Sequence, residues 1–162
     1  MQLFLKTPPS NEPISLEEAR AYLRLSLNQE ESFLHTLIAT ARAYVENMTG
    51  RALLKQKWLM QIKPPYPSFS PLVKWEGKDL EIELPYPPLL EVEIAQVAKK
   101  DIPFMTEENK VRLSPSLWNK TISITYWAGY GETGASLPPD LKMAVLMATR
   151  FFYDNQKVDT AL

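Results

Sequence analysis

The chain has 162 residues, of which 45% are hydrophobic, and its 18 basic and 19 acidic residues give a formal net charge of −1. This length fits one domain over 1–162, and the apolar content is too high for a disordered chain. The sequence has no cysteine, which excludes disulfides and thiolate metal sites. It has a single histidine, which disfavours catalytic relays and metal sites that need histidine.

The charge balance and hydropathy narrow the class of partner. Tight, sequence-specific DNA binding needs a clear basic excess, because neutralising phosphates dominates that affinity. No apolar run reaches the roughly 18 residues of a membrane span. Residues 1–13 lack the length and cleavage pattern of a signal peptide. We therefore expect no membrane contact, and a protein that stays in the cytoplasm where it is made or in a particle assembled there.

A short helix is expected after an extended arm, residues 1–13, which holds three prolines. Within the arm, Leu3 to Leu5 are suited to the edge of a sheet. Ser15 and Glu18 have the spacing of a capping box, in which each side chain bonds the other residue's backbone. This box predicts a helix start at Ser15, with an apolar face formed by Leu16, Ala19, Tyr22 and Leu23.

The strongest helical pattern covers residues 28–50. Asn28 and Glu31 repeat the capping spacing, and Gly50 can adopt the left-handed conformation that ends a helix. One stripe at helical period is formed by Phe33, Leu34, Leu37, Ile38, Ala41, Val45 and Met48. We expect residues 14–50 to pack as a helical pair.

A β region is predicted over residues 51–135. Its proline-rich part, 63–79, is expected to be a loop or extended flap, because proline cannot donate to a central ladder. Alternating apolar and polar residues predict strands on both sides of this loop. The predicted strands are 55–62, 80–84, 90–98, 111–113 and 121–127.

A last helix is predicted over 138–155, followed by a flexible tail at 156–162. Two prolines suit its first turn, where missing N–H donors cost nothing. One stripe runs through Leu141, Ala144, Val145, Ala148, Phe151, Phe152 and Asn155. The opposite side is also partly apolar, so this helix needs more than one packing partner. The residues we expect at a subunit interface are Met143, Leu146, Met147, Arg150 and Tyr153.

These elements predict an α+β fold. We expect a mainly helical core of short helix, long helix and C-terminal helix. A small antiparallel β region is inserted between the long helix and the last one.

Two patterns could signal chemistry. The glycines of 129–134 match a dinucleotide-binding fingerprint, but further residues separate the third glycine from the helix and no second strand follows. We interpret them as a strand-to-helix turn.

Four carboxylates alternate outward on two predicted strands: Glu81, Glu83, Glu91 and Glu93. They form a solvated face, an acidic surface lining a channel or meeting a partner, or a catalytic pair. We predict no enzyme, no catalytic residue, no cofactor and no metal.

The layout resembles a known family over about residues 14–157. SLEEARAYLRL precedes a long helix that ends AYVENMTGRALLKQKW, and LPYPPLLEV follows in the β region. ITYWAGYG then leads into LPPDLKMAVLMATRFFYDN. Its most specific pieces are TGRAL, LPYPPL and AGYG before a proline-started helix. Together they resemble the head–tail connector, adaptor or head-completion proteins of long-tailed phages and prophages.

The resemblance implies a structural assembly protein of the virion, found at the head–tail junction and assembled in the host bacterial cytoplasm. Such proteins form a ring, usually a dodecamer, beneath the portal protein. The ring extends the DNA channel, through which DNA passes without sequence-specific binding, and docks stopper or tail proteins. The alternatives are another neck component, such as a stopper or tail-completion protein, and a small carboxylate-based enzyme. The 63–79 segment departs from compact members as an insertion.

Overall fold

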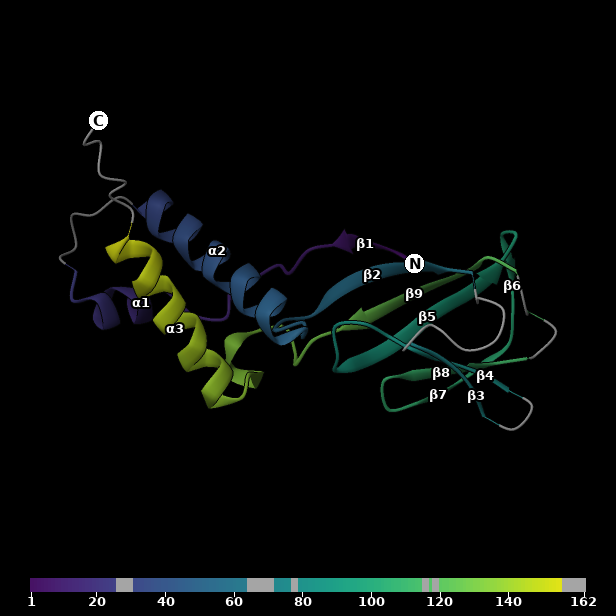
Figure 1. Cartoon of the computed structure of the whole chain (residues 1–162). Coiled ribbons are helices and arrows are strands. Elements are labelled where there is room, and N and C mark those ends of the chain that lie inside the picture. Colours follow the sequence, from purple (N-terminus) through teal and green to yellow (C-terminus); the bar gives the residue numbers. More distant parts are fainter. Residues whose placement is uncertain (26–30, 64–71, 77–78, 115–116, 118–119, 156–162) are drawn as a thin grey trace, which may run out of the picture. The chain divides into compact units, whose positions relative to one another are not determined.

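The computed structural model describes residues 1–25, 31–63, 72–76, 79–114, 117 and 120–155. The chain divides into two compact units. The sheet unit comprises Met1–Pro8 and Lys55–Gly129, and the helical unit comprises Pro9–Leu54 and Tyr130–Leu162. Figure 1 shows that the strands belong to the sheet unit and the helices to the helical unit.

Three α-helices build the described part of the helical unit. They are α1 (Leu16–Leu23), α2 (Glu31–Thr49) and α3 (Pro139–Asp154), and a short 3-10 helix, η2 (Gly134–Ser136), precedes α3. The predicted capping box at α1 is confirmed, since Ser15 accepts from the Glu18 N–H and Glu18 accepts from the Ser15 N–H. Pro139 opens α3, as expected for a residue without a donor. The capping residue predicted for α2, Asn28, lies outside the described residues.

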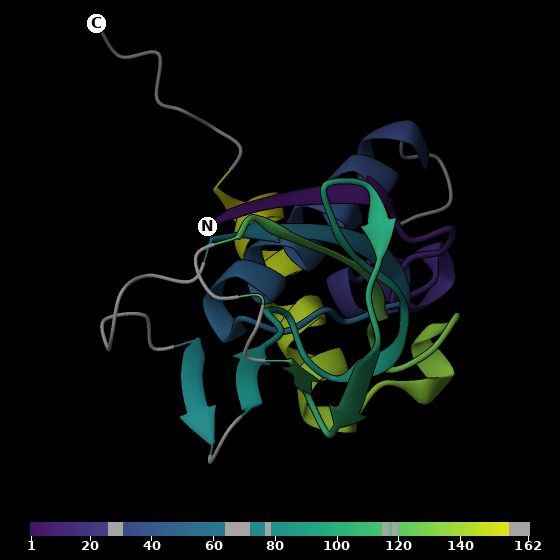
Figure 2. The ribbon, with the colours of Figure 1, turned by 90° about the vertical axis from the view of Figure 1, so that its right-hand side faces the viewer.

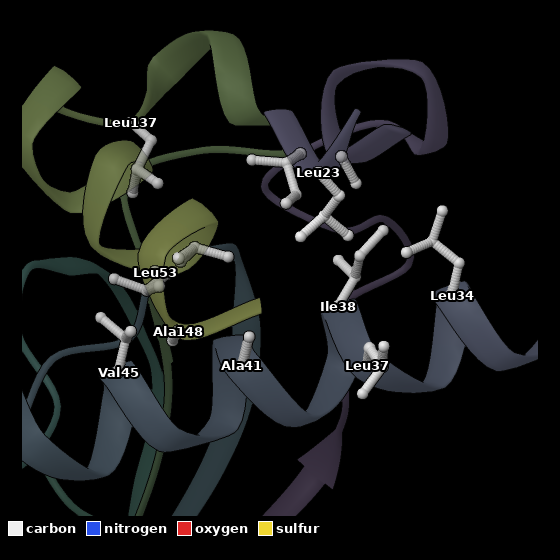
Figure 3. Close-up of a cluster of buried hydrophobic side chains, with 12 residues drawn as sticks. Leu23, Leu34, Leu37, Ile38, Ala41, Val45, Leu53, Leu137 and Ala148 are labelled. Carbon is white, nitrogen blue, oxygen red and sulfur yellow. The ribbon is translucent and has the colours of Figure 1, made fainter. Parts of the chain in front are cut away.

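The buried stripe of α2 forms the centre of the helical unit. Figure 3 shows side chains from all three helices and from Leu53 pointing into one cluster. Ile38 is 1% exposed and Ala41 is fully buried, so α2 is covered along its length by α1 and α3. The stripe's two outermost members differ from expectation, because Phe33 and Met48 are 38% and 69% exposed. After α2, Gly50 has a φ of 64°, which confirms the predicted helix stop.

A five-stranded antiparallel sheet forms one layer of the sheet unit. Its order is β1-β2-β9-β5-β6. The strands are β1 (Gln2–Thr7), β2 (Gln56–Ile62), β5 (Leu89–Val97), β6 (Lys100–Asp101) and β9 (Ile122–Ala128). Central β9 alternates as predicted, with Ile122, Ile124 and Tyr126 fully buried. The expectation that Leu3 to Leu5 add to a sheet edge is confirmed, since β1 pairs with β2.

A four-stranded antiparallel sheet forms the second layer, in the order β3-β4-β8-β7. Its strands are β3 (Val73–Glu76), β4 (Asp79–Glu83), β7 (Phe104–Glu107) and β8 (Lys110–Leu113). Figure 2 shows β3 and β4 on the opposite side of this unit from β1. Asn109 ties the β7–β8 turn to the chain between β4 and β5, because its carbonyl accepts from Leu84 N and its side chain accepts from Leu89 N.

The prediction of a mainly helical core with a small β region is wrong. Over the described residues, the fold is a sheet-rich α+β fold with three α-helices and about 36% strand in two antiparallel sheets. The sheets bury their own core, in which Leu80, Ile82 and Val111 are fully inaccessible. A strand stripe of three or four residues gives a weaker sequence signal than a five-turn helix, so the prediction underestimated the sheets.

Local differences have local causes. Part of the segment expected to be a loop over 63–79 forms β3, an edge strand, while 64–71 and 77–78 lie outside the described residues. Leu90 opens the alternating pattern of the predicted strand 90–98 but is 47% exposed, because β5 shifts register between Leu89 and Glu91. None of the helices in the described part of the chain is both long enough and apolar enough to cross a membrane.

Candidate assembly surface

Two helices of the helical unit expose large apolar side chains in rows. On α3, Met143, Met147 and Phe151 follow one another at steps of four and are 47%, 59% and 60% exposed. On α2, Tyr44 and Met48 are also four apart and are 49% and 69% exposed. We call these five residues the apolar face.

Aromatic contacts join the two rows. The ring of Phe152 lies 5.5 Å from that of Tyr44 and 5.6 Å from that of Phe151, edge-on in both cases. This arrangement is favourable for aromatic quadrupoles and holds all three rings in place. The apolar face is therefore a preformed surface, whose chemistry suits packing against another apolar surface.

The predicted interface residues of α3 divide between surface and core. Met143, Met147 and Arg150 are exposed, and Arg150 forms an exposed ion pair with Asp154 at 3.3 Å. Leu146 and Tyr153 are partly buried and pack against the core of the helical unit. Their role at a subunit interface stays a prediction.

Sequence reasoning missed part of the apolar face. Phe151 belongs to the predicted stripe that starts at Leu141, not to the expected interface residues, yet it is 60% exposed. Tyr44 and Met48 stand on a helix whose other side fills the core, and their spacing of four residues was the available signal. Hydrophobic period alone could not decide which of two apolar stripes on α3 faces inward.

The four predicted carboxylates lie on two strands of different sheets. Glu81 and Glu83 are on β4 in the four-stranded sheet, whereas Glu91 and Glu93 are on β5 in the five-stranded sheet. The single face predicted for all four is therefore not formed by neighbouring strands of one sheet. Whether any of them faces a channel or a partner stays a prediction.

Glu81 is a buried member of an ion-pair network. It is 6% exposed, and its carboxylate lies 2.8 Å from Lys110 Nζ and 3.5 Å from Arg112 Nε. Arg112 also reaches Glu107 at 2.8 Å. These cross-strand ion pairs compensate the negative charge of a carboxylate that is buried in the sheet. Glu81 is thereby held between two basic side chains of the neighbouring strand β8.

Glu93 pairs with a lysine across the five-stranded sheet. Its carboxylate lies 2.9 Å from Lys57 Nζ, which also stands 4.7 Å from the ring centre of Trp127. Lys55 lies over the same ring at 5.0 Å. Trp127 thus carries two lysine ammonium groups near its ring.

An open groove of about 810 Å³ lies along the N-terminal arm of the helical unit. Its ionisable lining includes Glu18, whose carboxylate bonds Lys142 Nζ and the Ser15 N–H. The Lys142 hydrogen bond, with the Ser15 bond and the lysine charge, holds the Glu18 pKa below its ordinary value. Within the described residues, no group of three or more His, Cys, Asp or Glu is placed to hold a metal ion.

A second network anchors the arm to α2. Arg42 Nε lies 2.8 Å from the Glu12 carboxylate and Arg42 Nη1 lies 3.0 Å from that of Glu46. Burial alone would lower the Arg42 pKa, but the hydrogen bonds and charges of the two glutamates raise it above its ordinary value. The other oxygen of Glu46 accepts from the Leu53 N–H at 2.9 Å.

The N-terminal part of the chain matches a family model. Residues 13–76, from the end of the arm through β3, match the Phage gp6-like head-tail connector protein family. This bears out the resemblance drawn from the sequence motifs. No curated protein matches the chain.

Several solved structures share the fold over the whole chain. One chain from the "Virion of native gene transfer agent (GTA) particle" is 20% identical with a TM-score of 0.76, covering 100% of this chain and 89% of its own. A chain from the "Neck of native GTA particle computed with C12 symmetry" is 18% identical with a TM-score of 0.75, covering 100% and 88%. A chain from the "Neck of empty GTA particle computed with C6 symmetry" is 19% identical with a TM-score of 0.72, covering 99% and 88%.

Proposed function

We propose that this chain is a structural head–tail connector, one subunit of a homo-oligomeric ring in the neck of a virion. The observation that carries the proposal is the match of residues 13–76 to the head-tail connector family. The fold shared with chains of gene transfer agent particles and their necks supports it, because that likeness extends over the whole chain. The neck structures with C6 and C12 symmetry are the reason to propose a ring, and a dodecamer in particular.

In this proposal the ring sits beneath the portal protein, extends the DNA channel and docks stopper or tail proteins. It forms in the host bacterial cytoplasm and remains at the head–tail junction of the particle. No catalytic step is part of the proposal, since the connector family and the gene transfer agent particle chains are structural components of particles.

The apolar face provides the physical reason to assemble. A ring is built from head-to-tail contacts, so each subunit offers two different surfaces to its neighbours. Burying a methionine or phenylalanine side chain contributes about 1.5–3 kcal/mol, and the same contact recurs at every subunit boundary. We assign the apolar face, with Arg150 at its margin, to one side of that boundary.

The test is the assembly state of the purified chain mixed with its cognate portal protein. Mass photometry and negative-stain images are expected to show complexes with the mass of a portal plus a ring. Met147→Glu places a charge in the apolar face and should abolish the ring, while its thermal unfolding stays unchanged because Met147 is 59% exposed.

The matched control is Met105→Glu. Met105 is 69% exposed on β7 of the sheet unit, outside the proposed contact, so this variant should assemble like the wild type. Finding only monomers of the wild type with portal present would refute the ring. Equal loss of assembly in both variants would refute the assignment of the apolar face while leaving the ring standing.

A further inference from the structure

One end of the five-stranded sheet carries four exposed lysines on adjacent strands. Ile62 of β2 and Val97 of β5 both pair with Ile122 of β9, so these three strands end in one row. Lys100 of β6 lies in this row, opposite Val97, and Lys63, Lys99 and Lys120 lie just beyond it. We call these four residues the lysine end. Figure 1 shows the end of β2, the start of β9 and the β5–β6 turn together at this end. At about 4.8 Å per strand, the cluster spans roughly 15 Å.

The lysine end carries a local excess of positive charge, because four lysines face one carboxylate, that of Asp101. None of its four lysines forms an ion pair within the described part of the chain, in contrast to Lys57 and Lys110 on the sheet faces. The acid of this row, Asp101, accepts a hydrogen bond from the Gln96 side chain at 2.8 Å. Four exposed cations within roughly 15 Å repel one another, an arrangement that an anion would relieve.

The backbone at this end is unusual. Ala98 and Lys99 make the two-residue turn between β5 and β6, with φ of 50° and 64°. Such turns favour asparagine and glycine, because most side chains resist the left-handed region. Lys99 shares this local cost with Ala98 in the same turn and with Glu108, φ 51°, in the β7–β8 turn. The turn fixes where the Lys99 side chain leaves the backbone.

The choice of lysine distinguishes a nucleic acid from a protein partner. The sheet unit has eleven basic and nine acidic residues, and ten of its basic residues are lysines. The helical unit has seven basic and ten acidic residues, and five of its basic residues are arginines. Protein interfaces are enriched in arginine and aromatic residues and depleted in lysine, whereas phosphates accept lysine as a simple point charge.

We infer that the lysine end contacts the phosphate backbone of duplex DNA without reading its sequence. This goes beyond the proposed function, in which DNA only passes through a channel. Each phosphate contact contributes a slope of about −0.9 to the dependence of log K on log salt, so four contacts give a slope of about −3.6. Affinity should then fall roughly 150-fold between 50 and 200 mM salt.

The experiment measures fluorescence anisotropy of a labelled 30-base-pair duplex with the isolated full chain from 25 to 200 mM NaCl. The wild type is expected to bind two unrelated sequences equally, with the slope given above. The double variant Lys99→Asn/Lys100→Gln should reduce the magnitude of the slope by about 1.8. Asparagine is used at position 99 because it tolerates the left-handed turn.

The matched control is Lys6→Gln/Lys74→Gln. It removes the same charge from exposed positions of the same unit, away from the lysine end, and should keep the wild-type slope. Equal losses in both double variants, or no binding at 25 mM salt, would overturn the inference. So would polyglutamate competing as well as unlabelled DNA, which would indicate an acidic protein partner. Ring assembly plays no part in this assay, so its outcome is separate from that of the proposed function.

Discussion

Replacing Glu46 should destabilise the helical unit more than any single surface change. Its carboxylate is 7% exposed and accepts from Arg42 Nη1 and from the Leu53 N–H. In Glu46→Ala, the buried Leu53 donor loses this acceptor at a cost of about 1–3 kcal/mol. Arg42 loses a charge-assisted bond of about 1.5–3 kcal/mol but keeps Glu12. Together these terms predict a loss of roughly 3–5 kcal/mol.

The isosteric variant separates the two terms. Glu46→Gln keeps an acceptor for the Leu53 N–H and removes the charge that faces Arg42, so we expect a loss of about 1–3 kcal/mol. The difference in unfolding free energy between wild type and Glu46→Gln therefore measures the charge term. The further difference between Glu46→Gln and Glu46→Ala measures the lost hydrogen-bond acceptor. With a urea slope of about 2 kcal/mol/M, the alanine variant should shift the unfolding midpoint by about 2 M.

The chain offers a separate probe for each unit. All four tryptophans lie in the sheet unit, and all described α-helices lie in the helical unit. Circular dichroism at 222 nm should therefore follow the helical unit while tryptophan fluorescence follows the sheet unit. The control is Glu31→Ala, which removes the other glutamate of α2, an exposed partner of Arg20. A Glu46→Ala midpoint equal to that of Glu31→Ala would refute the reasoning.

Three smaller predictions test other parts of the fold. Lys142 depresses the Glu18 pKa, so the stability from this pair is present above the ordinary carboxyl pKa and lost as pH falls below it. Thermal scans of wild type and Glu18→Gln should therefore converge between pH 6 and 3. Gly134→Ala should cost about 1–3 kcal/mol in urea unfolding, because the new Cβ would stand 1.9 Å from the Pro13 carbonyl oxygen. Burial raises the Tyr126 pKa, so this residue should not ionise near pH 10. Absorbance at 295 nm should therefore show the same number of tyrosines titrating near pH 10 in the wild type and in Tyr126→Phe.

The helices were predictable because their signals are local. Ser15 and Glu18 carry both halves of a capping box, and Gly50 provides the left-handed stop, so each boundary is encoded within a few residues. The stripe of α2 from Leu34 to Val45 repeats over three turns, enough for the period to be unambiguous.

The sheets were less predictable because their pairing is not local. No local pattern around Leu3 predicts that β1 pairs with a strand almost sixty residues later. In that pairing Leu3 lies opposite Met60. Nor does alternation reveal that β4 and β5 enter different sheets although only a short PYPP-containing connection joins them. The four glutamates could be placed on strands correctly, yet their grouping depended on a sheet order that the sequence does not display.

The surface residues follow a similar rule. Met143 and Met147 are predicted interface residues and both are exposed, but Phe151, placed on the other stripe of the same helix, is exposed as well. A helix with two apolar stripes leaves the rotation undecided, because burial is settled by the partners that α1 and α2 provide. Tertiary packing, not period, turned Phe151 outward.

Net charge gives the most misleading summary of this chain. A value of −1 argues against gripping DNA only when charge is spread evenly, since exposed charges interact over about 8 Å at physiological salt. Here the helical unit has an excess of acids and the sheet unit an excess of lysines, so the two nearly cancel in the total. A polyanion at the lysine end meets a local excess of lysine charge, offset in part by Asp101, rather than the molecular average. Local charge density, and not net charge, therefore decides whether this end can hold a polyanion.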